Sequence, residues 1–278
     1  MADDQGNPAM SRSRHTLGFG LFVCLLGCDG TPENVQQPAA TAAAAGPAAV
    51  PGYVQAALAD PGRAMHRGAD ERRKPAELIA FSGLKPGDRV LDLIPGDGYW
   101  TRLFSPIVGP QGRVYAVWPK NYADVAQGNV KTLREIAASP AYANVRVEVQ
   151  PSAILSAPEP LDMIWTSQNY HDYPDEFMGN IDPAQLNRAV FAMLKPGGTW
   201  FVIDHAAQVG SGMRDTETLH RIDPALVRQQ VEAAGFEFVG ESGVLGNSAD
   251  SRALPVFDPS VRGRTDQFVM RLRKPDAS

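Results

Sequence analysis

Apolar runs of strand length alternate with helical patterns from about Tyr53 to the end of the chain. The apolar runs are bounded by turn residues and fall at 89–94, 113–118, 145–149, 161–166, 199–204, 236–240 and 267–272. Helical patterns occur at 53–59, 75–82, 122–138, 183–194 and 224–234, and another begins after Gly98. This alternation predicts an α/β fold with βαβ units and a mostly parallel sheet. The last two strands follow each other without a helix, so we expect an antiparallel edge.

The most distinctive local pattern is the first of these strands with the turn that follows it. The strand carries Asp92 near its end, and the turn consists of Pro95, Gly96, Asp97 and Gly98. Glycines let a ligand approach the backbone, and the free N–H groups at a helix N-terminus attract an anionic group. The pattern favours a nucleotide-binding loop, although a plain tight turn has the same local sequence.

The first fifty residues differ in character from the rest. Arg12 and Arg14 precede a short apolar segment that ends in Leu-Leu-Gly-Cys28. Such a segment is typical of a secretory signal, and its end resembles the lipobox of bacterial lipoproteins, which implies that Cys28 is lipidated. We therefore expect a signal peptide at 1–27, a flexible Ala/Pro-rich tether at 28–52 and a folded domain at 53–278. The alternative is an accidental apolar run.

This leader predicts an exported protein. The lipoprotein resemblance implies that the lipid alone attaches the chain to the membrane at the cell envelope. Asp29, directly after Cys28, implies the periplasmic face of the inner membrane. The second cysteine, Cys24, lies in the leader, so the expected domain contains no thiol for a disulfide framework.

Composition narrows the class of ligand. The 278 residues are 44% hydrophobic, as in ordinary globular proteins, and carry a formal net charge of −5. Nucleic-acid binding normally requires clustered Lys and Arg, and the sequence has no basic run. We therefore expect a small-molecule substrate and no nucleic acid.

The order of motifs resembles class I S-adenosylmethionine-dependent methyltransferases over about residues 75–275. The resemblance rests on the strand–helix alternation, the loop from Asp92 to Gly98, and Leu-Lys-Pro-Gly-Gly at 194–198 before the fifth strand. It implies a Rossmann-like sheet of seven mostly parallel strands with helices on both faces and one antiparallel edge strand. It also implies S-adenosylmethionine as cofactor. His171-Asp172 and Asp204-His205, after the fourth and fifth strands, are similar to a group of predicted exported bacterial methyltransferases.

By this resemblance, the cofactor would lie on the loop that comprises Asp92, Ile94, Pro95, Gly96 and Gly98. The chain departs from the family at three of the expected positions, one of which is Gln150-Pro151-Ser152, where an acidic residue often meets the adenine amino group. Ile94 replaces the first glycine, and no acidic residue follows the second strand to hold the ribose. Trp118 stands near that point and could stack on adenine through its aromatic face, or lie in the core.

Candidate catalytic residues follow two neighbouring strands. We expect His171, Asp172, Asp204 and His205 at the carboxyl ends of the strands, where open α/β sheets bind ligands. A histidine can accept a proton from a nucleophile, and a carboxylate can orient it. These four residues and His220 also offer nitrogen and oxygen ligands for a divalent ion. No HxxxH spacing occurs, so no metal site is assigned.

The sequence therefore predicts methyl transfer to a small-molecule acceptor. One alternative is a binding or scaffold protein that keeps the fold without catalysis, and another is a metal-assisted hydrolase using the same crevice. The connection 210–223 could close over the substrate, with Arg214 or Arg221 binding an anionic group, or be a solvated loop. The connection 247–265 is expected to pack through salt bridges.

Overall fold

The computed structural model describes residues 49–277. The expected signal peptide, Cys28 and all but the last residues of the expected tether lie outside this range. The first described helix, α1 (Gly52–Ala59), begins one residue before the expected domain start. Within 49–277, no helix combines the length and the apolar character needed to cross a membrane.

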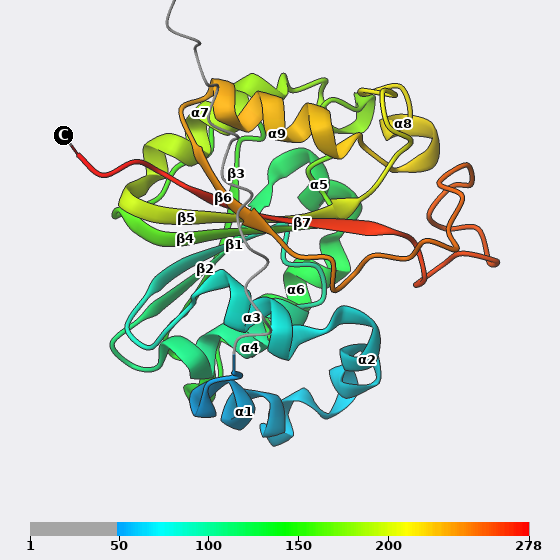
Figure 1. Cartoon of the computed structure of the whole chain (residues 1–278). Helices are drawn as coiled ribbons and strands as arrows, with labels where there is room; N and C mark the ends of the chain where they lie inside the picture. Colours follow the sequence, from blue (N-terminus) through cyan, green and yellow to red (C-terminus); the bar gives the residue numbers. More distant parts are fainter. Residues whose placement is uncertain (1–48, 278) are drawn as a thin grey trace, which may run out of the picture. The chain divides into compact units, whose positions relative to one another are not determined.

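Seven strands form one sheet in the order β3-β2-β1-β4-β5-β7-β6 (Figure 1). They are β1 (Arg89–Leu93), β2 (Arg113–Pro119), β3 (Val145–Gln150), β4 (Leu161–Ser167), β5 (Leu194–His205), β6 (Glu237–Glu241) and β7 (Gln267–Arg273). The pairs among β1 to β5 are parallel, whereas β7 is antiparallel to both β5 and β6. The predicted mostly parallel sheet with an antiparallel pair at one edge is confirmed. Within that pair, β7 lies inside and β6 forms the edge.

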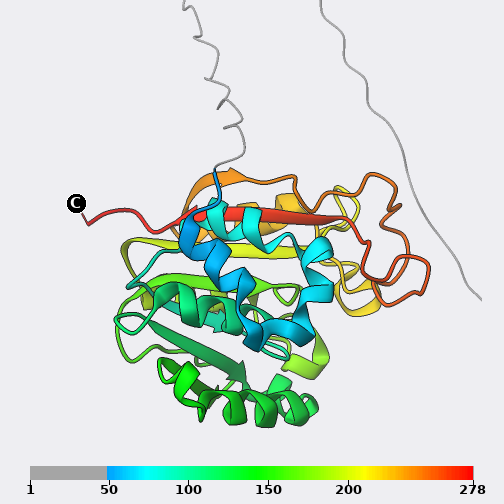
Figure 2. The same cartoon turned by 90° about the horizontal axis from the view of Figure 1, so that it is seen from below.

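Helices cover both faces of the sheet (Figures 1 and 2). Besides α1 they are α2 (Asp70–Arg73), α3 (Pro75–Ser82), α4 (Tyr99–Val108), α5 (Lys120–Val125), α6 (Gln127–Ala137), α7 (Pro183–Met193), α8 (Thr216–Leu219) and α9 (Pro224–Ala233), with 3-10 segments at Pro61–Ala69, Pro140–Tyr142 and Glu176–Met178. Apolar residues of α7 and α9 belong to one core cluster, and those of α1, α3 and α4 belong to the other. The sheet thus lies between two hydrophobic cores.

Local signals explain several helix boundaries. Helices α3, α7 and α9 each begin with Pro, whose fixed φ suits the first helical turn. Asp182 and Asp223 cap α7 and α9, because their carboxylates accept hydrogen bonds from backbone N–H groups two residues later. Gly83 ends α3 with φ of 80°.

Some sequence expectations on elements were wrong, and one helical segment was not expected. The single helix expected at 122–138 is two helices, α5 and α6, which break at Ala126 (φ −113°). Gly128 directly after the break is a weak helix former, and the turn lets α5 pack on β2 and α6 on β3. Residues 61–73 form helical turns, although the sequence has no apolar period there. Asp204 and His205 are the last residues of β5 rather than residues after it.

Candidate functional site

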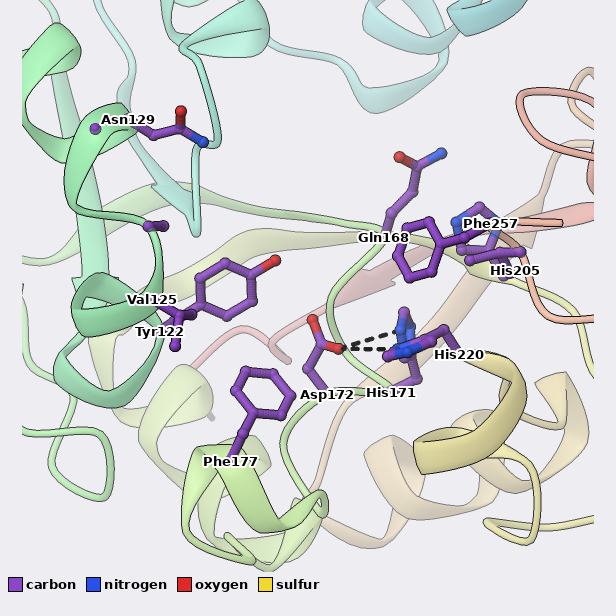
Figure 3. Close-up of a pocket in the computed structure, with 13 residues that line it drawn as sticks. Tyr122, Val125, Asn129, Gln168, His171, Asp172, Phe177, His205, His220 and Phe257 are labelled. Carbon is purple, nitrogen blue, oxygen red and sulfur yellow. Dashed lines mark ion pairs between the residues drawn. The ribbon is translucent and has the colours of Figure 1, made fainter. Parts of the chain in front are cut away.

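A cavity of about 580 Å³ opens beyond the carboxyl ends of the parallel strands (Figure 3). Its walls come from α5 and α6 after β2, from the connection after β4, from the end of β5 and from the connections after β5 and β6. The lining residues are Tyr122, Val125, Ala126, Gly128, Asn129, Gln168, His171, Asp172, Phe177, His205, His220, Val256 and Phe257. The structure therefore brings His171, Asp172 and His205 together around one space, as the sequence predicted.

Asp204 holds the backbone and the ring of His171 in place. Its fully buried carboxylate accepts hydrogen bonds from the backbone N–H of His171 (2.9 Å) and from that of His205 (2.7 Å). The same carboxylate lies 2.7 Å from His171 Nδ1. These contacts fix the orientation of the imidazole and leave its Nε2 on the side of Asp172. Asp204 is therefore a positioning residue. It lies behind the cavity and does not line it.

His171 lies between two carboxylates. Its Nε2 is 3.2 Å from Asp172 Oδ1, on the opposite side of the ring from Asp204. Burial lowers the pKa of His171, but the two carboxylates outweigh burial and raise the pKa well above its ordinary value. Burial raises the pKa of Asp172, but the imidazoles of His171 and His220 outweigh burial. The pKa of Asp172 is therefore lower than its ordinary value. Both carboxylates therefore favour the protonated form of His171, which cannot act as a general base.

His205 has the opposite protonation state. Burial lowers its pKa to about 4, against the opposing effect of Asp204, so its imidazole is neutral at pH 7. Its Nδ1 lies 2.8 Å from the hydroxyl of Thr265. When Nδ1–H donates to Thr265, Nε2 is the free acceptor of the ring. Of the two predicted histidines, His205 is therefore the one able to accept a proton.

His220 completes a compact group with His171 and Asp172. It follows the short helix α8 with a left-handed backbone (φ 53°), and its Nδ1 lies 3.8 Å from Asp172 Oδ1. One ligand atom of each of the three residues lies within 4.8 Å of the others. Asp204 and His205, the remaining candidates, are not part of this group.

The predicted cofactor loop lies next to the cavity but does not line it. Asp92, Ile94, Pro95 and Gly98 are buried, and Gly96 is partly exposed. A Cβ at Gly96 would meet no atom of the described residues within 4 Å, and its φ is 59°, so the backbone there is open to a ligand. A Cβ at Gly98 would lie 2.7 Å from Leu133 Cδ1, which makes this glycine a packing residue for α6.

Asp92 is a buried carboxyl group below this loop. Burial raises its pKa to about 7, although the Thr101 hydroxyl donates a hydrogen bond of 2.6 Å to it and Arg73 lies near. Ile94 has a left-handed backbone conformation, with φ of 56°, which normally favours glycine. Asn169 holds this conformation, because its side-chain amide donates to the carbonyls of Leu93 and Ile94 at 3.3 Å each.

Trp118 lies in the hydrophobic core with no exposed surface. Its ring packs against Tyr122, with the ring centroids 5.8 Å apart, and it is not among the residues that line the cavity. The sequence allowed Trp118 either to stack on adenine or to lie in the core, and in this conformation it lies in the core. Stacking on adenine would require the ring to become exposed.

The structure adds residues that sequence reasoning missed. Tyr122, Asn129 and Gln168 line the cavity with polar groups (Figure 3). Burial raises the pKa of Tyr122 to about 12, so its hydroxyl stays protonated. Their one sequence signal is position, since Tyr122 and Gln168 come shortly after strands. No residue-type motif distinguishes them.

The arginines of the two long connections are engaged in the fold. The guanidinium of Arg221 and the carboxylate of Asp250 are both fully buried and lie 2.8 Å apart. Arg221 is therefore not available to an anionic substrate, contrary to one sequence hypothesis. Arg214 pairs with Asp215 at 2.7 Å. Arg252 pairs with Asp266 at 2.6 Å, so the expected salt-bridged packing of 247–265 is confirmed.

Two curated proteins named ubiquinone/menaquinone biosynthesis C-methyltransferase UbiE are similar in sequence. The one from Teredinibacter turnerae is 30% identical over 169 residues, which are 59% of this chain and 63% of the relative. The one from Shewanella woodyi is 29% identical over 171 residues, 59% of this chain and 62% of the relative. The chain thus spans less than two thirds of the length of these relatives. No protein-family model matches it.

Solved structures share this fold at low sequence identity. A SAM-dependent methyltransferase from Aquifex aeolicus is 19% identical, with a TM-score of 0.50 over 80% of this chain and 96% of that protein. The [4+2]-cyclase SpnF is 18% identical, with a TM-score of 0.54 over 76% of this chain and 81% of that protein. The described part of the chain thus has the fold of class I S-adenosylmethionine-dependent methyltransferases.

Proposed function

We propose that this protein is an S-adenosylmethionine-dependent methyltransferase whose small-molecule acceptor binds in the cavity lined by His171 and His205. The observation that carries the proposal is the position of the cavity. It opens at the carboxyl ends of β4 and β5 and beside the glycine loop that follows β1, where sheets of this kind bind ligands. Its volume of about 580 Å³ is within the range for small-molecule sites. The names of the sequence relatives support methyl transfer, while the ubiquinone/menaquinone biosynthesis in those names is said of the relatives alone.

The residues present fit the cofactor at two places. The open backbone at Gly96, followed by the N-terminus of the ten-residue helix α4, would hold the methionine end. Tyr122 and Asn129, on the β2 side of the cavity, would contact the nucleoside where the family's acidic residue is missing. When bound, the cofactor supplies a methyl group already activated by its sulfonium.

The chain's own residues would align the acceptor and remove its proton. Holding the reacting atoms in line supplies much of the rate. His205 is neutral, lines the cavity, and would take the proton of an acceptor hydroxyl or amine on Nε2. Phe177 and Phe257, on opposite sides of the cavity in Figure 3, would exclude water from the acceptor.

Isothermal titration of the purified protein with S-adenosylmethionine tests the proposal. We expect one site per chain, with weaker binding in Asn129→Ala than in the wild type. No binding up to millimolar cofactor would leave methyl transfer without support. Once an acceptor is found, His205→Gln should lower kcat by about 10²–10⁴-fold with little change in KM. His66→Gln, outside the cavity, is the matched histidine control.

A binding or scaffold protein is the second candidate function. The burial of Trp118 and Asp92 favours it, because neither reaches the cavity in this conformation. SpnF also shows that a protein of this fold can carry a name other than methyltransferase. A cavity that binds small molecules but not S-adenosylmethionine in the titration would favour this candidate. The hydrolase alternative requires, in addition, a metal ion beside the substrate.

We also propose, from the leader sequence alone, that the protein is exported and lipid-anchored through Cys28 at the cell envelope. Metabolic labelling with a radioactive fatty acid in a bacterial host tests this. We expect label in the wild type and none in Cys28→Ala, with Cys24→Ala as the matched control. Equal labelling of wild type and Cys28→Ala would exclude the anchor.

A further inference from the structure

We propose that His171, Asp172 and His220 form a binding site for a divalent transition-metal ion, with its open coordination positions facing the cavity. The set consists of two imidazole nitrogens and one carboxylate oxygen. Zinc and other first-row ions are bound by such sets when further positions are left for water or substrate. This proposal does not depend on methyl transfer, because it concerns only whether the ion binds.

The distances within the set are compatible with a shared ion, which would replace the proton on His171 Nε2. Asp172 Oδ1 lies 3.2 Å from His171 Nε2 and 3.8 Å from His220 Nδ1. Two ligand atoms bound to one zinc ion by bonds of about 2.1 Å lie about 3.0–3.4 Å apart. The first distance is within this range, and the second needs a small rotation of the His220 ring. As a hydrogen bond, 3.8 Å is too long.

The residues behind the set are those that metal sites use to orient their ligands. Asp204 lies 2.7 Å from His171 Nδ1 and so fixes the ring with Nε2 toward Asp172. A carboxylate on the second nitrogen of a ligating histidine also raises the basicity of the nitrogen that binds the ion. His220 is fixed from the other side by Phe257, whose ring meets the imidazole edge to face at 4.9 Å.

The position of His220 in the chain supports a role beyond packing. Its left-handed φ of 53° is unfavourable for a residue with a Cβ. The next residue, Arg221, is anchored by a fully buried pair with Asp250, which fixes the backbone beside His220. Backbone strain of this kind occurs at functional sites, where the surrounding structure stabilises it.

The cavity gives the ion access to a ligand. All three side chains line it, and Tyr122 and Gln168 are polar groups on its other walls (Figure 3). An ion held there would bind an oxygen of a substrate or of water and lower the pKa of that oxygen. The substrate class that fits is therefore a small molecule with a hydroxyl or carboxylate oxygen.

Titration with zinc chloride alone tests the site. Metal-depleted wild-type protein should bind one zinc ion per chain with a micromolar or lower Kd in isothermal titration. Asp172→Asn and His220→Gln should each weaken binding at least tenfold, and Asp204→Asn about 10–100-fold through the lost orientation of His171. His66→Gln should bind zinc as the wild type does. Circular dichroism checks that each variant is folded.

Two results would overturn the site. One is an affinity that neither Asp172→Asn nor His220→Gln changes, and the other is no zinc binding by the wild type at millimolar zinc. Should the variants fail to fold, anomalous scattering from zinc-soaked wild-type crystals decides. A peak between the three side chains supports the site, and a crystal without that peak contradicts it. These results are independent of S-adenosylmethionine, so methyl transfer can fail while the metal site holds, or the reverse.

Discussion

Two buried aspartates differ in the groups that contact their carboxyl oxygens. Asp204 accepts two backbone N–H bonds and faces the His171 ring. Asp92 accepts one hydrogen bond, from the Thr101 hydroxyl, and has no ion-pair partner among the described residues. Burial therefore prevails at Asp92 and raises its pKa to about 7.

The raised pKa of Asp92 predicts a pH-dependent effect of Asp92→Asn. A carboxyl group whose pKa is higher in the folded state than in the unfolded chain destabilises the fold as pH rises from about 4 to about 7. Asn cannot ionise, so the stability of the variant relative to the wild type should rise over this range, by at most about 1.4 kcal/mol per pH unit. Urea unfolding at a series of pH values measures it, and parallel profiles of the two proteins would contradict the assignment.

The left-handed backbone at Ile94 predicts that replacement by Gly and by Ala changes stability in the reverse of the usual order. Ala normally exceeds Gly in stability by about 0.5–1 kcal/mol in regular elements. At the left-handed φ of 56°, Gly avoids a Cβ penalty of about 1–2 kcal/mol, so Ile94→Gly should be more stable than Ile94→Ala. Ile79, buried in α3, is the control and should show the ordinary order. Denaturant melts of the four variants decide, and the ordinary order at Ile94 would refute the strained backbone.

At the scale of elements, the turn between β1 and α4 joins the glycine loop to α6. Gly98 and Gly96 both have positive φ, but Gly98 alone faces Leu133 of α6. The sequence motif suggested that both glycines let a ligand approach the backbone. Gly98 instead allows the turn to pack against α6. The turn is thus fixed on its α6 side and open at Gly96.

Gly98→Ala should therefore destabilise the protein more than Gly96→Ala, by about 1–3 kcal/mol of overpacking. Leu133→Ala makes room for the new methyl group, so the double variant should be more stable than the sum of the two single effects predicts. Urea unfolding of the wild type and the four variants tests both statements. Equal losses at Gly98 and Gly96, or strict additivity, would show that the contact with Leu133 does not constrain the turn.

Element boundaries followed local chemistry where strong signals were present. The helix at 75–82 was predicted to the residue, because Pro75 begins it and Gly83 ends it. The break at Ala126 had no such signal and depends on how α5 and α6 fit β2 and β3. Residues 61–73 had no apolar period in the sequence, and their helical turns are stabilised by polar contacts such as the ion pair of Arg63 with Asp70.

For the whole molecule, the buried pair of Arg221 and Asp250 joins two long connections beyond the sheet. Arg221 precedes α9 and Asp250 lies between β6 and β7, with 2.8 Å between Nη1 and Oδ2. Arg221 also donates to the carbonyls of Ala206 and Leu254. The pair therefore fixes the backbone that carries His220 and the segment that carries Phe257.

Asp250→Asn should lower the free energy of unfolding by about 3–5 kcal/mol at neutral pH, because it leaves the guanidinium charge buried without a partner. Burial raises the pKa of Asp250, but backbone N–H donors and Arg221 reverse this and leave the pKa below its ordinary value. The carboxylate thus stabilises the fold above that ordinary pKa, and the effect is lost as pH falls through the lowered pKa. The gap between the wild type and the variant should close in acid, and thermal melts from neutral to acidic pH measure it.

The sequence by itself determined the succession of strands and helices, the glycine turn after Asp92 and the histidines placed at strand ends. Those features depend on side-chain periodicity and on backbone preferences of Gly and Pro, which are local. Tertiary structure decided which of those residues meet. It buried Trp118, paired Arg221 with Asp250, and brought His220 to Asp172 from a connection 48 residues later. Such proximity arises from packing between distant segments, and a single sequence does not encode it in any local pattern.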